Sequence, residues 1–231
     1  MKPIGILGGM SWQSTQLYYR LINEAVGREL GGLHSAELLI DSLDFATFDR
    51  LQRANDWAAM GADLARRAMG LEAAGAQAML IGSNTMHRVA DTVAEAIQVP
   101  LIHLVDEVGA HAAHRGWGRL ALLGTRFTMS GSLYPERLAT RGIEVVAPDG
   151  ADADRIDAII FEELCLGELR PESRTFYLEV VAGLAAAGCD AVILGCTEIG
   201  LLLDTDEDCP LPRIDSAEIH AQAAVRFALD R

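Results

Sequence analysis

The sequence is poor in aromatic residues and in positive charge. Phe, Trp and Tyr make up 6% of its 231 residues, and 33 Asp and Glu outnumber 19 Lys and Arg, which gives a formal net charge of −14. Nucleic-acid-binding domains usually carry a basic patch, and an anionic membrane surface repels an acidic protein. We therefore expect no nucleic-acid partner and no membrane partner.

Long apolar runs are also absent. No segment approaches the ~18 consecutive apolar residues of a membrane-spanning helix. The apolar run within residues 1–10 is too short for a signal peptide with its cleavage site, and it predicts a buried strand. These features favour a cytoplasmic protein.

Motifs for metals and nucleotides are missing too. The cysteines are Cys165, Cys189, Cys196 and Cys209; they form no CxxC pair and no metal-binding spacing with histidine, so we expect reduced thiols and no metal. The glycine-rich segment 5–11 lacks the GxGxxG spacing of dinucleotide sites and the GK[ST] of P-loops. It forms either a structural turn or a set of backbone N–H groups that bind a carboxylate, and we favour the second.

What the sequence does contain is an alternation of short apolar segments with longer amphipathic ones. Several apolar segments are nearly continuous, as in strands that are covered on both faces. The alternation predicts an α/β fold with parallel sheets and right-handed crossovers. The predicted strands are 4–7, 36–42, 78–81, 101–104, 119–123, 144–146 and 191–194, and the predicted helices include 12–29, 57–74, 153–165, 173–187 and 216–227.

An internal repeat divides the chain. GAQAMLIGSNTMH (75–87) aligns without gaps on GCDAVILGCTEIG (188–200), so that Ser83 falls on Cys196. IGILGGMSW (4–12) resembles LALLGTRFTM (120–129), so that Gly8 falls on Gly124. The spacing from Gly8 to Ser83 is 75 residues and from Gly124 to Cys196 is 72. We therefore predict two pseudo-symmetric lobes, residues 1–100 with 213–231 and residues 101–212, each a parallel sheet flanked by helices.

The repeat places Ser83 and Cys196 directly after a strand and a glycine. Ligands of open α/β sheets bind beyond the carboxyl ends of the strands, so both residues are candidates for one site. The start of the following helix favours a thiolate at Cys196 and predicts a lowered pKa for that thiol. Two such loops that face each other could remove a proton from one side of a carbon and return it from the other.

Several segments together resemble the aspartate/glutamate racemase family, and in particular the branch that acts on aspartate and glutamate. The likeness keeps its order across nearly the whole chain. The segments are GILGGMSWQST (5–15), GGLHSAELLIDSLDF (31–45), SNTMH (83–87), ALLGTRFTM (121–129), FEELCLGEL (161–169) and GCTEIGLLL (195–203).

This resemblance implies a racemase with two α/β lobes that uses neither a cofactor nor a metal and that commonly forms a homodimer. In the family each lobe supplies a cysteine, and the two thiols act as base and acid on opposite faces of the α-carbon. Those catalytic positions are Ser83 and Cys196 here. The positions implied to bind the substrate are Met10, Gln52, Asn84, Thr85, Thr125, Thr197 and Glu198.

Ser83 departs from the family's pair of cysteines. A serine hydroxyl is a poor base at neutral pH unless a neighbour activates it, although it can donate a proton. Three explanations remain: a natural hydroxyl/thiol pair with a preferred direction, an engineered replacement of a native cysteine, or altered chemistry that needs one cysteine. His87 either activates Ser83 or is structural, and Arg50, Arg53, Arg126 and Arg174 either bind a substrate carboxylate or are solvated surface charges.

We therefore expect a racemase of L-aspartate and/or L-glutamate. The main alternative is a single-cysteine decarboxylase or isomerase that acts on a dicarboxylate. A binding protein with a degenerate site is a third hypothesis, and a cysteine hydrolase is disfavoured because no His or Asp has an evident place beside Cys196.

Overall fold

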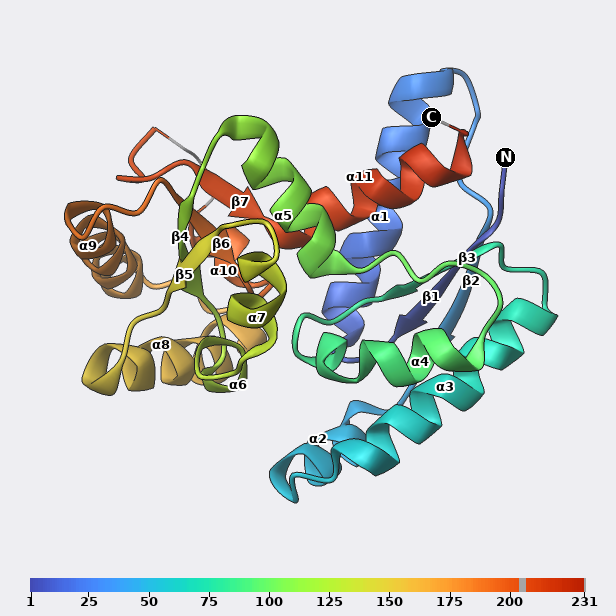
Figure 1. Cartoon of the computed structure of the whole chain (residues 1–231), viewed down its shortest axis with the longest axis horizontal. Coiled ribbons are helices and arrows are strands. Elements are labelled where there is room, and N and C mark those ends of the chain that lie inside the picture. The colour runs from blue at the N-terminus through green and yellow to red at the C-terminus, as the bar shows by residue number, and fades with distance from the viewer. Residues whose placement is uncertain (204–206, 231) are drawn as a thin grey trace. The chain divides into compact units, whose positions relative to one another are not determined.

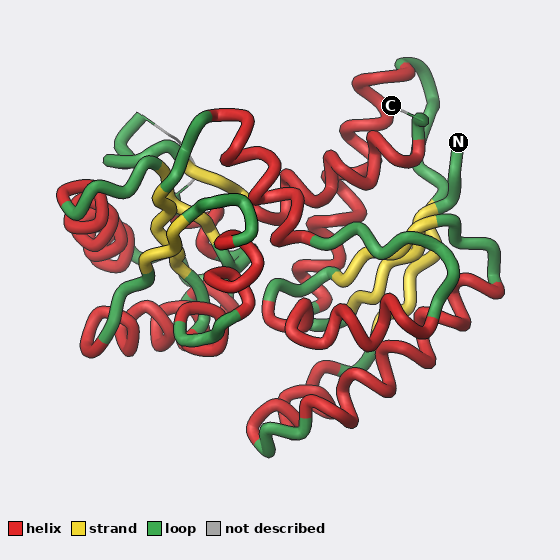
Figure 2. Tube along the Cα trace, viewed as in Figure 1, coloured by secondary structure: helices red, strands yellow, loops and turns green. Residues whose placement is uncertain are grey.

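The computed structural model describes residues 1–203 and 207–230. The chain divides into two compact units, Met1–Leu104 with Ala217–Arg231, and Val105–Ser216. Each unit contains its own parallel sheet, and helices surround the strands in each unit (Figures 1 and 2). The predicted α/β class is therefore confirmed. No helix in the described ranges is both long enough and apolar enough to cross a bilayer.

The first unit has a three-stranded sheet in the order β2-β1-β3. All its pairings are parallel, with Ile6 opposite Ile40 on one side and opposite Leu80 on the other. The strands are β1 (Ile4–Gly8), β2 (Leu38–Ser42) and β3 (Ala78–Ile81), and the helical segments are α1 (Trp12–Leu30), α2 (Phe45–Arg53), α3 (Trp57–Ala73), the 3-10 helix η1 (Thr85–Val89), α4 (Ala90–Ala96) and α11 (Ser216–Ala228).

Alternate residues of these strands contact helices on opposite faces of the sheet. Ile4 and Ile6 of β1 pack in one cluster with α1 and α11, whereas Leu7 packs with α3 and α4. The two helix layers are visible on either side of this sheet (Figure 1). Burial on both faces explains why β1 and β3 are apolar throughout in the sequence.

The second unit has a four-stranded parallel sheet in the order β5-β4-β6-β7. One face carries a cluster formed by β4, β6, α8 and α9, which includes Leu123, Leu194 and Tyr177. The strands are β4 (Arg119–Leu123), β5 (Glu144–Val146), β6 (Ala191–Leu194) and β7 (Arg213–Asp215), and the helical segments are α5 (Leu104–Arg115), α6 (Arg126–Met129), α7 (Leu133–Ala139), α8 (Gly150–Glu162), the 3-10 helix η2 (Leu164–Leu166), α9 (Pro171–Ala186) and α10 (Ile199–Leu202).

The two sheets repeat the same local plan. β1 lies between β2 and β3, and β4 lies between β5 and β6. The Gly82 N–H donates to the Leu7 carbonyl at 2.9 Å, and the Gly195 N–H donates to the Leu123 carbonyl at 2.7 Å. Leu7 and Leu123 each precede the first glycine of the aligned segments, so the hydrogen bonds follow the repeat seen in the sequence.

One predicted strand is wrong and one strand was not predicted. Residues 101–104 form a single bridge, Leu101 to Met79, and the chain then enters α5 at Leu104. At the corresponding place in the second unit, β7 pairs with β6 over three residues. β7 is short and has polar ends, so its sequence lacks the apolar run that marks the other strands. Because β7 belongs to the second sheet, that unit extends to Ser216 and does not end at residue 212.

Candidate active site

The Ser83 loop crosses the end of β1 in the first unit. β3 ends at Ile81, and Gly82 and Ser83 connect it to η1. A side chain at position 82 would come within 3.3 Å of the Leu7 carbonyl oxygen, so a glycine permits this close crossing. Ser83 is half-buried, and Asn84 directly after it is buried.

Two side chains hold the carbonyl groups of this loop. Ser14 Oγ donates to the Gly82 carbonyl at 3.0 Å, and His87 Nδ1 lies 2.8 Å from the Ser83 carbonyl. His87 Nε2 accepts from the Leu104 N–H at 3.2 Å, so the proton of the neutral ring resides on Nδ1. His87 is therefore bonded to the backbone of Ser83. No hydrogen bond joins the Ser83 hydroxyl to any residue within 1–203 or 207–230, so nothing described activates it as a base.

The other first-unit candidates lie on segments that follow the strands of the first sheet. Met10 follows β1 and packs in one buried cluster with Phe48 of α2 and Met86 of η1. Gln52 lies one turn after Phe48 and is half-buried. Thr85 opens η1 and is also half-buried. The structure thus brings Met10, Ser83, Asn84 and Thr85 to the carboxyl end of the first sheet, while Gln52 lies near the C-terminus of α2.

The Cys196 loop has the same position in the second unit. β6 ends at Leu194, and a side chain at Gly195 would come within 2.8 Å of the Leu123 carbonyl oxygen. The Cys196 thiol donates to Glu198 Oε2 at 3.0 Å, and Thr197 Oγ1 donates to the same oxygen at 2.7 Å. Glu198 is buried, whereas Cys196 and Thr197 are half-buried.

The prediction of a lowered thiol pKa is wrong. Burial of the thiol, the negative charge of Glu198 and the hydrogen bond to it raise the pKa of Cys196 well above its usual value. The helix that follows, α10, spans only Ile199–Leu202, so its dipole offers little compensation. Cys196 is therefore a neutral thiol in the unliganded protein.

Thr125 lies on the neighbouring loop of the second unit. It caps α6 at the end of β4, and its hydroxyl is 3.2 Å from that of Thr128. A side chain at Gly124 would come within 3.3 Å of the Gly195 carbonyl oxygen, which shows that the β4 and β6 loops are adjacent. Thr125, Cys196, Thr197 and Glu198 therefore share the carboxyl end of the second sheet.

The four arginines considered as carboxylate ligands have partners on the surface. Arg53 pairs with Asp49 at 2.8 Å, Arg174 pairs with Asp208 at 3.2 Å, and Arg126 pairs with Asp154. Arg50 donates to Thr47 at 3.2 Å. These contacts favour the explanation that the four are structural surface charges.

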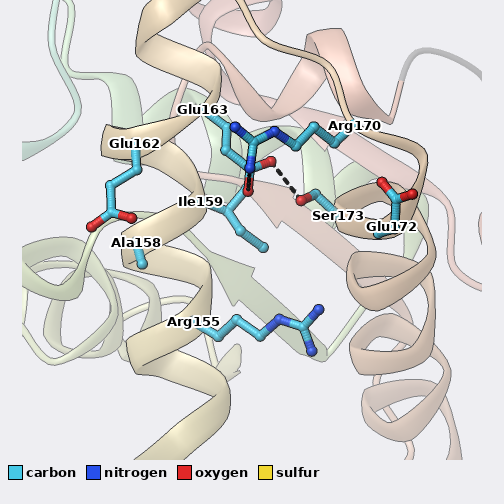
Figure 3. Close-up of a pocket in the computed structure, with 8 residues that line it drawn as sticks. All are labelled: Arg155, Ala158, Ile159, Glu162, Glu163, Arg170, Glu172 and Ser173. Carbon is cyan, nitrogen blue, oxygen red and sulfur yellow. Dashed lines mark hydrogen bonds and ion pairs between the residues drawn. The ribbon is translucent and has the colours of Figure 1, made fainter.

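A separate pocket of about 400 Å³ lies between α8 and α9, and nothing in the sequence indicated it (Figure 3). Its one hydroxyl, Ser173 Oγ, donates to Glu163 at 2.6 Å, and Arg170 pairs with the same carboxylate at 3.4 Å. None of the predicted site residues lines it. Within the described ranges, no group of three or more His, Cys, Asp or Glu side chains is arranged to hold a metal ion.

Sequence reasoning considered His87 but missed Ser14, the other side chain that holds the Ser83 loop. Ser14 reaches the Gly82 carbonyl from α1, a separation of 68 residues along the chain. Nothing local in the sequence marks such a contact. Glu198, whose carboxylate raises the pKa of Cys196, was predicted only as a substrate-binding residue.

Comparison with known proteins agrees with the fold. A model of the Asp/Glu/Hydantoin racemase family matches residues 7–224. A crystal structure from Yersinia pestis assigned to the Asp/Glu racemases has a TM-score of 0.94 and 43% identity, over 99% of this chain and 100% of that chain. An aspartate racemase homologue from Pyrococcus horikoshii OT3 has a TM-score of 0.87 and 34% identity, over the same shares of the two chains.

A curated relative, the broad specificity amino-acid racemase RacX of Bacillus subtilis (strain 168), is 24% identical over 227 residues, which is 96% of each chain. The family match covers most of this chain, and the structural likeness covers nearly all of it. The chain therefore belongs to the Asp/Glu/Hydantoin racemase family and is an isomerase of that family.

Proposed function

We propose that this enzyme racemises an acidic amino acid, aspartate and/or glutamate, without a cofactor. Ser83 and Cys196 exchange protons with opposite faces of the α-carbon. The observation that carries this proposal is the matched position of the two residues, each after a strand and a close-crossing glycine of one repeated sheet. The family membership supports the same reaction class.

The two residues have unequal roles in this proposal. A thiol is far more acidic than an alcohol, so Cys196 is the group that can become a base. Ser83 supplies a proton from the other face. The enzyme therefore favours removal of the α-proton by Cys196 and works more readily on one enantiomer.

Substrate binding is assigned to groups around both loops. Asn84, Thr85, Thr125 and Thr197 offer amide and hydroxyl groups to the carboxylates and the amine of the substrate. Met10 comes from the loop after β1 and Gln52 from α2, and in this proposal both bound the space for the substrate side chain. We also propose that the enzyme is cytoplasmic and forms a homodimer.

NMR of the α-proton in heavy water tests the reaction. The wild-type protein exchanges the α-proton of aspartate or glutamate for deuterium, and Cys196→Ala lowers the rate by roughly 100-fold or more, as expected for loss of an acid–base group. Ser83→Cys makes the rates from the two enantiomers more equal. Cys189→Ala, which removes a buried thiol outside both loops, serves as the control and keeps the wild-type rate. Absence of exchange with both enantiomers of both amino acids contradicts the proposal.

A second candidate follows from the protonated Cys196 and the unactivated Ser83 hydroxyl. A single thiol that donates one proton suffices for a decarboxylase or an isomerase of a dicarboxylate. Release of carbon dioxide from a substituted malonate, or conversion of maleate to fumarate, without α-proton exchange on amino acids identifies this chemistry.

A further inference from the structure

We propose that Glu198 accepts the thiol proton of Cys196 when the substrate binds, so that the thiolate exists only in the occupied site. This inference rests on the proposed racemase function. It assigns Glu198 a positioning role that acts through Cys196, in place of the direct substrate contact implied by resemblance.

The hydrogen bonds at Glu198 carry the proposal. Its Oε2 atom accepts from the Cys196 thiol at 3.0 Å and from the Thr197 hydroxyl at 2.7 Å. Glu198 is only 8% exposed, so solvent replaces these donors poorly. The carboxylate is therefore held with one oxygen within hydrogen-bonding distance of the sulfur.

Within residues 1–203 and 207–230, the other ionisable groups around Cys196 do not compete for that proton. Cys165 and Tyr177 are its further electrostatic neighbours, and both are neutral acids whose own pKa values are raised by burial. Glu198 is the carboxylate that acts on both cysteines. The thiol proton therefore has an acceptor within hydrogen-bonding distance, and that acceptor is Glu198.

The transfer is balanced and changes no net charge. The S–H bond of Cys196 breaks, an O–H bond forms at Glu198 Oε2, and a thiolate beside a carboxylic acid replaces a thiol beside a carboxylate. The thiolate then takes the α-proton of the substrate. In the reverse direction Cys196 returns its proton to the α-carbon, and the thiolate that this leaves takes back the proton from Glu198.

An acidic amino acid drives this transfer by its own charges. Its ammonium group stabilises a nearby thiolate, and its carboxylates disfavour a second anion at Glu198. Both effects move the proton from sulfur to oxygen. In the empty site the charges of the substrate are absent, so the proton stays on the sulfur. The neutral thiol is less prone to oxidation than a thiolate.

Alkylation and racemisation of Glu198→Gln together test the proposal. The amide is nearly isosteric but uncharged, so the pKa of the thiol in the free variant is lower and the thiol reacts with iodoacetamide about tenfold faster near pH 8 than in wild type. The same variant loses its proton acceptor, and its kcat for α-proton exchange falls by about tenfold or more. Cys196→Ala measures the alkylation background from the other three cysteines.

Glu198→Asp is the matched variant, because it keeps the charge and moves the carboxylate. Its free thiol alkylates at a rate close to wild type, while its kcat falls because the acceptor is withdrawn from the sulfur. A more reactive thiol with an unchanged or raised kcat in Glu198→Gln overturns the proposal, and so does a raised KM with an unchanged kcat, which marks a substrate ligand. A wild-type protein that exchanges no α-proton overturns the proposed function itself, and the alkylation rates then still report the pairing of thiol and carboxylate.

Discussion

His220 is a fully buried histidine in the first unit, and its two ring nitrogens have different partners. Nε2 lies 2.7 Å from the Ile102 carbonyl and donates to it, so Nδ1 accepts from the Tyr18 hydroxyl at 2.8 Å. The ring centroids of His220 and His87 are 5.4 Å apart, and His87 holds the Ser83 carbonyl. A neutral His220 is thus built into the support of the Ser83 loop.

Burial lowers the pKa of His220 to about 4, and the neighbouring His103 adds to this effect while the Ile102 carbonyl opposes it. In the unfolded chain the pKa is about 6.5. As the pH falls below about 6.5, the unfolded state binds a proton that the folded state refuses, so the free energy of unfolding decreases by about 1.4 kcal/mol per pH unit until about pH 4. Urea unfolding at a series of pH values measures this slope.

His220→Gln is the control for that slope, because glutamine retains a donor and an acceptor but does not titrate. Its free energy of unfolding depends less on pH than that of wild type by up to about 3 kcal/mol across the same interval. His111, whose pKa is also lowered by burial, is present in both proteins and cancels in the comparison. Parallel curves for the two proteins contradict the assignment.

At the scale of the element, α11 has an apolar stripe that completes the first unit. Ala217, Ala221, Ala224 and Ala228 recur at helical spacing and lie in one cluster with the strand residues Ile4 and Ile6. The sequence predicted this helix at 216–227, and the structure has it at Ser216–Ala228. Small side chains permit the helix to approach the sheet closely.

Ala224→Asp tests the contribution of α11. The position is fully buried, so an unpaired carboxylate there lowers the free energy of unfolding by on the order of 3 kcal/mol or more. Gln222→Asp on the exposed side of the same helix lowers it by only about 0.5 kcal/mol. Chemical denaturation gives both values, and amide exchange in β1 shows whether the loss reaches the sheet. Equal effects of the two substitutions exclude a packing role for α11.

At the scale of the whole molecule, an exposed aromatic face on α1 is a candidate contact for the proposed homodimer. Trp12 and Tyr19 are seven residues apart on α1, so they share one face, and they are 63% and 54% exposed. Aromatic residues are enriched at protein interfaces, so this face is a candidate for the contact. Sedimentation velocity of wild type gives about twice the chain mass of 24.8 kDa, and Tyr19→Glu shifts it toward one chain mass, whereas Tyr19→Phe does not. A wild-type protein that sediments as a single chain contradicts the dimer.

Much of the architecture could be predicted because its signals are local. β1, β3, β4 and β6 are buried on both faces and are therefore apolar throughout or nearly so. Residues 101–104 carry the same apolar signal, yet they form a bridge and then the start of a helix. The signal reports burial and does not report which of two buried structures the chain adopts.

The sequence by itself determined the α/β class, the internal repeat and the positions of Ser83 and Cys196 after matching strands, because periodicity and spacing are properties of the chain. The tertiary structure decided the chemical state of the site residues. The pKa of Cys196 depends on the Glu198 carboxylate turned toward its sulfur, and the role of His87 depends on an N–H 17 residues away. Ionisation and tautomer depend on electrostatic and hydrogen-bonding partners in space, so only the folded chain determines them.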